Sequence, residues 1–142
     1  MILMDPRFPT AEHILAKILE DKFGVRVGIC RFDDKKGLLE VNSKVDLREI
    51  DSKNLEKEAN EVIGRNLTVK KYIIPRKEAD KVVNLWKVPD SVKEVRIVEI
   101  KDFDKRPCKD DHVDNTSEIG KMSITSVERV GKDRYRYLFT LI

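Results

Sequence analysis

The 142-residue chain has the length of one ordinary domain, and its 40% of hydrophobic residues supply enough apolar material for a core, which excludes wholesale disorder. Charged residues make up 39% of the chain, yet the formal net charge is only +3. This balance excludes a protein that coats nucleic acid through a large one-sided excess of positive charge, so any nucleic-acid contact is expected to be local. A high density of both charge signs is typical of proteins that work at high temperature.

The sequence contains no signal for a membrane or for export. No apolar run approaches the roughly 18 residues that cross a bilayer. The N-terminal stretch MILMDPRFPTAEH lacks the charged region, long apolar region and cleavage site of an export signal. The two cysteines, Cys30 and Cys108, are too few for a disulfide framework and suit a reducing compartment. We therefore expect a cytoplasmic protein with no membrane partner.

The first predicted element is an amphipathic helix in TAEHILAKILEDKFG. Its apolar residues recur at the spacing of one helix face: Ala11, Ile14, Leu15, Ile18 and Leu19. Thr10 can cap the start of this helix, and Gly24 suits its end. At about 100° per residue, His13 lies nearly opposite the centre of the apolar stripe, so the pattern does not predict a core histidine.

Strands, helices and turns follow in mixed order. Residues 25–31 predict a half-buried strand in which Val27 and Ile29 face one side and Cys30 the other, and residues 38–45 predict its hairpin partner. The later predicted elements are a helix at 52–66 capped by Ser52, a strand at 67–75, a short helix at 76–86 that buries Ala79, Val82, Val83 and Trp86, a strand at 94–100, a polar loop at 106–120, and a hairpin at 121–142 with Tyr135, Tyr137, Phe139 and Leu141 on one face.

This order of elements predicts an α+β fold of two layers. Helices are expected to pack on one face of a mostly antiparallel or mixed sheet. The chain shows no internal repeat, low-complexity tract or linker, so we expect one domain over residues 1–142.

The chain has only four histidine and cysteine side chains: His13, Cys30, Cys108 and His112. Cys108 and His112 form a C-x-x-x-H motif in the polar loop RPCKDDHVDNTSEIG. Zinc favours thiolate and imidazole ligands in tetrahedral geometry. The spacing alone also fits a solvated loop with a partly buried Cys108, and a single helix histidine is more often an exposed surface residue.

Two segments taken together resemble a known family. PTAEHILAKIL and CKDDHVDNTSEIG resemble the signature of the alanyl-tRNA synthetase editing domain, and especially of its freestanding relatives, the AlaX trans-editing proteins. The threonyl-tRNA synthetase editing domain shares this architecture. In that family a helical H-x-x-x-H precedes a distant C-x-x-x-H and a TGEIG-like turn. Here His13 matches the second histidine of the first motif, Cys108 and His112 match the second motif, and NTSEIG matches the turn with Ser117 in place of glycine.

The resemblance implies one Zn²⁺ ion held by His13, Cys108 and His112, with one departure from the family pattern. The position four residues before His13 is Pro9, which cannot bind a metal, although proline fits a helix start. Three outcomes stay open: zinc with three protein ligands and a water, a substitute fourth ligand, or a lost metal site. The candidates for a substitute ligand are Cys30, Glu12, Asp110 and Asp111.

The family also implies an activity, the hydrolysis of mischarged tRNA. The bond cleaved joins a wrong amino acid, usually serine, to the terminal adenosine of alanine tRNA, and glycine is a further candidate. Such editing corrects an error that a synthetase pocket for a small apolar residue cannot fully reject. The expected catalytic group is a zinc-bound water, although the zinc could instead recognise the aminoacyl group. The expected substrate contacts are Cys30, Thr116, Glu118 and Gly120; the alternatives are a structural turn and a Cys30 packed under a helix.

Lys105, Arg106 and Lys109 flank the expected ligands, and we expect them to meet phosphates of tRNA. A solvated charged face is the alternative. Two other functions remain open. One is a family member that binds tRNA or aminoacyl-adenosine without hydrolysis, for which Pro9 is the reason. The other is a structural zinc protein in which the metal only fastens the loop to the first helix.

Overall fold

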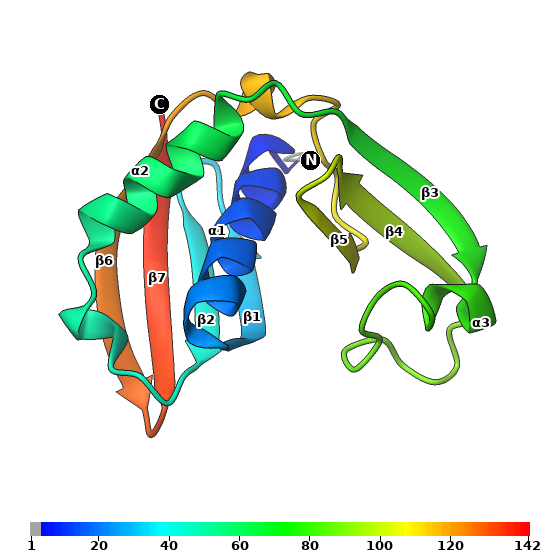
Figure 1. Ribbon diagram of the computed structural model, residues 1–142, viewed down its shortest axis with the longest axis horizontal. Coiled ribbons are helices and arrows are strands. Elements are labelled where there is room, and N and C mark those ends of the chain that lie inside the picture. The colour runs from blue at the N-terminus through cyan, green and yellow to red at the C-terminus, as the bar shows by residue number, and fades with distance from the viewer. Residues whose placement is uncertain (1–3) are drawn as a thin grey trace.

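The computed structural model describes residues 4–142 (Figure 1). Residues 1–3, which begin the N-terminal stretch without a predicted export signal, lie outside this part. The helices are α1 (Arg7–Phe23), α2 (Ser52–Ile63) and α3 (Arg76–Ala79), with 3-10 helices η1 (Leu47–Glu49) and η2 (Thr116–Ile119). The strands are β1 (Arg26–Phe32), β2 (Gly37–Asn42), β3 (Val69–Pro75), β4 (Glu94–Ile100), β5 (Asp104–Pro107), β6 (Met122–Gly131) and β7 (Arg134–Leu141). The predicted α+β class is confirmed.

The strands form two antiparallel sheets. The larger has the order β1-β2-β7-β6, and the smaller has the order β3-β4-β5. Helices α1 and α2 pack on the larger sheet, and α1 also contacts β5 of the smaller one. Figure 1 shows α1 between the two sheets. A helix in this position buries residues on more than one side.

The main core lies between the larger sheet and the two long helices. Every residue of the predicted apolar stripe of α1 is buried: Ala11, Ile14, Leu15, Ile18 and Leu19. Strand β7 adds Tyr135, Tyr137 and Phe139, as its alternation predicts, while Leu141 is half-buried against the same core. In the described residues no helix has the length and apolar character needed to cross a membrane.

Both long helices begin differently from the prediction. Helix α1 starts at Arg7, so Thr10 lies inside the helix, fully buried, and does not cap it. Helix α2 is capped by Asp51, whose side chain accepts a hydrogen bond from a first-turn N–H, and Ser52 is its first residue. The expected caps are therefore wrong at both starts: the N-cap of α1 is Pro6, with no side-chain cap hydrogen bond, and at α2 the neighbouring Asp51 takes the position predicted for Ser52.

The helix predicted at 76–86 is wrong beyond Ala79. The guanidinium of Arg76 donates hydrogen bonds to the carbonyls of three later residues, Val88, Pro89 and Val92, which closes the chain into a loop. Within this loop Leu85 is buried in a small second core, but Val82 and Trp86 are about half exposed rather than buried. The apolar residues after Ala79 therefore do not form one face of a helix; some of them, such as Leu85, instead hold the loop against the small second core.

A β-bulge changes which side of β1 faces the core. The pairing of β1 with β2 shifts between Val27 and Cys30. An extra residue in a strand reverses the alternation beyond it. Ile29 is therefore 49% exposed and does not share the buried face of Val27 as predicted, while Cys30 packs against the core, in agreement with the alternative of a Cys30 packed under a helix. This reversal turns Cys30 toward α1.

The predicted polar loop at 106–120 is also shorter than expected. Its first residues belong to β5, which pairs with β4 and returns the chain to α1. The same loop includes η2, a turn of 3-10 helix over Thr116–Ile119. Strand β5 is thus the element that brings Cys108 and His112 toward the first helix.

Candidate metal centre

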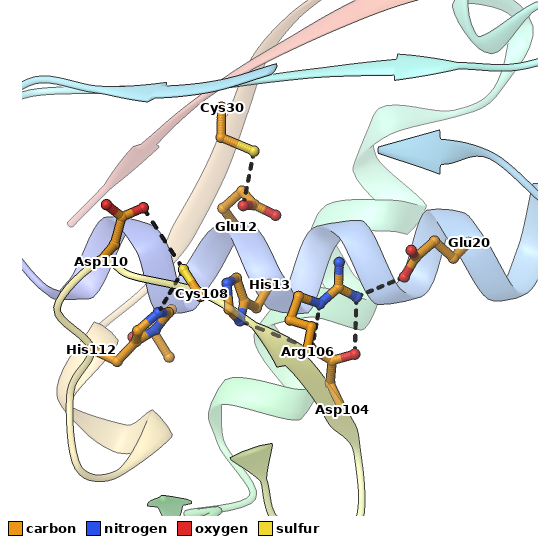
Figure 2. A network of polar contacts seen from close by, with 10 residues as sticks. Glu12, His13, Glu20, Cys30, Asp104, Arg106, Cys108, Asp110 and His112 are labelled. Carbon is orange, nitrogen blue, oxygen red and sulfur yellow. Dashed lines mark hydrogen bonds and ion pairs between the residues drawn. The ribbon is translucent and has the colours of Figure 1, made fainter. Parts of the chain in front are cut away.

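The three predicted ligands converge on one site. His13 comes from α1, and Cys108 and His112 come from the loop after β5 (Figure 2). One ligand atom from each lies within 4.8 Å of the other two. His112 Nε2 is 3.4 Å from Cys108 Sγ, and the two imidazole rings are 4.5 Å apart between centroids. Two imidazoles and one thiol at this separation are a suitable donor set for a zinc-like ion.

His13 is a buried residue, only 2% exposed, which corrects the prediction from the helical pattern. The pattern assumed that α1 buries one face only. Because α1 lies between two sheets, the side opposite the apolar stripe is also covered, and His13 occupies that side.

Thr10 holds His112 in place, a role that sequence reasoning missed. The Thr10 hydroxyl donates to the Pro6 carbonyl at 2.9 Å and accepts from the Val113 N–H at 3.2 Å. His112 Nδ1 lies 3.0 Å from the same oxygen. A hydroxyl has one hydrogen to donate, so Nδ1 must be the donor in this pair. The lone pair of a neutral His112 then sits on Nε2, the nitrogen that faces Cys108.

His13 is oriented by a less complete set of contacts. Its Nδ1 has no hydrogen-bond partner, although Asp104 Oδ2 is 4.0 Å away. Asp104 is itself buried and takes two hydrogen bonds from the guanidinium of Arg106, at 2.7 and 2.9 Å. A carboxylate behind a ligating histidine commonly sets its orientation and basicity. A buried imidazole nitrogen without a partner is the kind of atom that a ligand would complete.

Arg96 on β4 fixes the loop that contains the other two ligands. Its Nη1 donates to the Cys108 carbonyl at 3.0 Å and to the Asp110 carbonyl at 2.7 Å. Two bonds from one strand side chain hold the backbone on both sides of Lys109. The loop conformation is therefore set by the smaller sheet, while His13 is set by the helix.

The protonation states suit metal binding by the two histidines. Burial lowers the pKa of His13 well below its usual value, with His112 adding to the effect. Burial, with Arg96 nearby, lowers the pKa of His112 to about 4. Both imidazoles are therefore neutral at pH 7 with a free lone pair. Burial raises the pKa of the Cys108 thiol to about 11, so a metal must displace its proton on binding.

The described part of the chain offers no fourth side chain at the position that the family histidine would take in place of Pro9. Among residues 4–142, no other Cys, Asp or Glu joins the three ligand atoms within 4.8 Å of each. Asp110 Oδ2 comes to 3.8 Å from Cys108 Sγ alone, and Asp111 is exposed. Three protein ligands with one position left for water or substrate is the arrangement of catalytic zinc sites.

Cys30 and Glu12, the other two candidates, bond to each other. The Cys30 thiol donates to Glu12 Oε1 at 3.0 Å, and Glu12 is buried, at 6% exposed. Burial raises the pKa of Cys30, and the negative charge of Glu12 adds to that effect, so the thiol stays protonated. Figure 2 shows this pair beside the three ligands, on the β1 side of α1.

The NTSEIG turn is built by its own contacts. Thr116 is fully buried; its hydroxyl accepts from the Leu67 N–H and donates to the Ile63 carbonyl. The Glu118 side chain accepts from the backbone N–H groups at the start of η2 and completes a capping box. Gly120 has a φ of +85°, a conformation that favours glycine. These contacts agree with the alternative that the turn has a structural role. Contacts of these residues with a substrate stay a prediction.

The basic residues near the site differ in how free they are. Lys105 and Lys109 are exposed, although Lys105 Nζ is 3.7 Å from Glu99. Arg106 is only 17% exposed and is bound to Asp104 and Glu20. Arg106 is thus engaged in ion pairs inside the protein. Of the three predicted tRNA contacts, Lys105 and Lys109 stay accessible, and their contact with tRNA stays a prediction.

The sequence is similar to those of known proteins. Residues 95–136, which include Cys108 and His112, match the family described as Threonyl and Alanyl tRNA synthetase second additional domain. The chain is 33% identical over 144 residues to an alanyl-tRNA editing protein AlaX-M of Methanosarcina barkeri, and 35% identical over 141 residues to one of Saccharolobus solfataricus. These alignments cover 96% and 95% of this chain and 58% of each relative.

An alanine–tRNA ligase of Saccharolobus islandicus is also similar, at 39% identity over 130 residues, which are 87% of this chain and 14% of the ligase. The chain thus spans little more than half the length of its AlaX-M relatives and a small part of the ligase. The matched segment, the similarity along nearly the whole chain and the three converging side chains point the same way: the chain is similar to alanyl-tRNA editing proteins of the AlaX-M type, and residues 95–136 match the second additional domain of threonyl- and alanyl-tRNA synthetases.

Proposed function

We propose that this chain is a metal-dependent aminoacyl-tRNA deacylase that removes a wrong amino acid from alanine tRNA. Serine is the proposed amino acid, with glycine as a second candidate. The observation that carries the proposal is the three-ligand cluster of His13, Cys108 and His112 in a chain similar to alanyl-tRNA editing proteins over nearly all its length. A bound zinc would supply an activated water or polarise the ester carbonyl at the open position.

The protein side chains would prepare this site in three ways. His112 presents Nε2 because Thr10 holds its Nδ1, and His13 lies against Asp104. The loop bearing Cys108 is held by Arg96, so the ligands are in place before substrate arrives. Holding the ester in a fixed position beside the activated water would lower the entropic part of the activation free energy of hydrolysis.

The RNA would approach from the exposed side of the ligand loop. Lys105 and Lys109 are the exposed basic residues there, and the sparse net charge of +3 leaves recognition to such local contacts. We expect weak, salt-sensitive contacts with the phosphates near the acceptor end.

The test is deacylation of Ser-tRNA(Ala) together with metal analysis of the purified protein. His13→Ala and Cys108→Ala are expected to lose bound metal and to fall to the spontaneous rate of ester hydrolysis. Asp111→Ala is the matched control, since Asp111 is exposed in the same loop and stands outside the cluster. A wild-type protein that retains metal but shows no turnover would refute the proposal.

Pro9 favours one other function, binding without hydrolysis, because it removes a ligand position of the family. A Pro9→His variant separates the two. If this variant gains turnover that the wild type lacks, while both bind the aminoacyl end equally well, the natural protein is a binding module. Equal turnover by both proteins supports the deacylase.

A further inference from the structure

Glu12 is a buried acid with an unfilled hydrogen-bonding position. It is 6% exposed, Oε1 accepts from the Cys30 thiol, and Oε2 has no partner. Burying a carboxyl group without a partner is costly, and nearly all buried polar atoms in proteins are paired. An atom that departs from this rule beside a functional site calls for a partner from outside the protein.

The neighbouring cations of the protein are already used. Arg106 binds Asp104 and Glu20, and the ammonium of Lys87 donates to the Gly28 carbonyl. Neither forms a hydrogen bond with Glu12 in the described structure. The place beside Oε2 thus suits a positively charged donor.

The position of Glu12 relates it to the metal centre. It directly precedes His13 on α1 and reaches toward Cys30 on β1, and in Figure 2 its carboxyl group lies between Cys30 and the ligands. It is not a ligand itself, since it falls outside the three-atom cluster. A substrate that presents its ester to the open metal position would place the rest of the aminoacyl group close to Glu12.

An aminoacyl ester carries one cation near its carbonyl group, the α-ammonium. We propose that Glu12 binds this α-ammonium through Oε2, while the Cys30 thiol holds Oε1; the role rests on the proposed function. An ammonium offers N–H donors and a charge that offsets the buried carboxylate. A chain whose amine is acylated, as in peptidyl-tRNA, lacks that cation. Glu12 would thus confine the site to free aminoacyl esters and spare the nascent peptide.

The experiment measures binding of two non-hydrolysable probes by titration calorimetry at pH 6.5, where an α-amine with a pKa near 7.7 is protonated. One probe is the seryl amide of 3′-amino-3′-deoxyadenosine. The other is the glyceroyl amide, in which a hydroxyl replaces the ammonium. The wild type is expected to prefer the seryl probe by roughly 10- to 100-fold, the range of a charge-assisted hydrogen bond. Glu12→Gln is expected to reduce this preference to near unity with bound metal unchanged.

Asp21→Asn is the matched control, since Asp21 is an exposed acid on the same helix, and it should keep the full preference. A wild type that binds the two probes equally overturns the inference without any variant, even if Glu12→Gln fails to fold. A preference that persists in Glu12→Gln also overturns it. Failure to bind either probe overturns both the inference and the proposed function. A protein with the Glu12-dependent preference but no turnover of Ser-tRNA(Ala) refutes the deacylase and keeps the inference.

Discussion

At the scale of single residues, the candidate metal centre is supported by side chains other than its three candidate ligands. Thr10 is the clearest case, because its hydroxyl uses its one donor and two acceptor positions on Pro6, Val113 and His112. The arrangement fixes both the ring orientation and the tautomer of His112. Partners of this kind commonly affect metal affinity almost as strongly as the ligands do.

We therefore expect Thr10→Val to weaken zinc binding by about 10- to 100-fold. The change also leaves buried donors of Val113 and His112 without a partner, at a cost of about 1–3 kcal/mol in the free energy of unfolding. Competition with a zinc chelator and urea unfolding of the metal-free protein measure the two effects. Thr125→Val is the control, since Thr125 is exposed on β6, and it should change neither quantity noticeably. Unchanged zinc affinity in Thr10→Val would show that the tautomer of His112 is set elsewhere.

At the scale of elements, turns and strand irregularities place the site. The bulge in β1 turns Cys30 inward, and β5 brings the ligand loop to α1. The NTSEIG turn ends at Gly120, where η2 passes into β6. An added Cβ at Gly120 would collide with the carbonyl oxygen of Ile142. Gly120 is thus needed both for its positive φ and for the close approach of the C-terminus.

Gly24 provides the comparison for this turn. It also has a positive φ, +63°, but nothing lies within 4 Å of an added Cβ there. Gly24→Ala is expected to cost about 1–2 kcal/mol in the free energy of unfolding, the strain of a left-handed residue. Gly120→Ala should cost clearly more, because the backbone of Ile142 must also move. Urea unfolding of both variants measures these costs. Equal losses in the free energy of unfolding would mean that the backbone of Ile142 can move aside at no cost.

At the scale of the whole molecule, the candidate metal centre takes its side chains from elements that belong to both sheets. His13 belongs to the helix that covers the larger sheet, whereas Cys108 and His112 follow a strand of the smaller one. A ligand that binds only the folded arrangement stabilises it by mass action. The same ion should therefore stabilise the contact between α1 and the smaller sheet.

We expect zinc at a hundredfold excess over its dissociation constant to raise the free energy of unfolding by about 2.7 kcal/mol. Hydrogen exchange should slow in both α1 and the loop at 108–112, and a chelator should reverse both effects. Cys108→Ser is expected to bind zinc only weakly, so the same zinc concentration should neither stabilise it noticeably nor slow its hydrogen exchange. Protection confined to the loop would mean that the ion does not link the two sheets.

The sequence by itself predicted the three side chains that meet in the candidate metal centre, and it determined the α+β class and the order of most elements. Local periodicity and the two separated motifs contain that information, because helices and strands repeat within a few residues. Only the tertiary structure decided that His13 is buried, that Cys30 faces α1, and that Glu12 keeps an unpaired oxygen. These facts depend on contacts between distant segments, such as the bond between Thr10 and His112, 102 residues apart. A helical wheel assumes that a helix buries one face only. The spacing of the apolar residues in α1 does not show that the smaller sheet covers a second side of this helix.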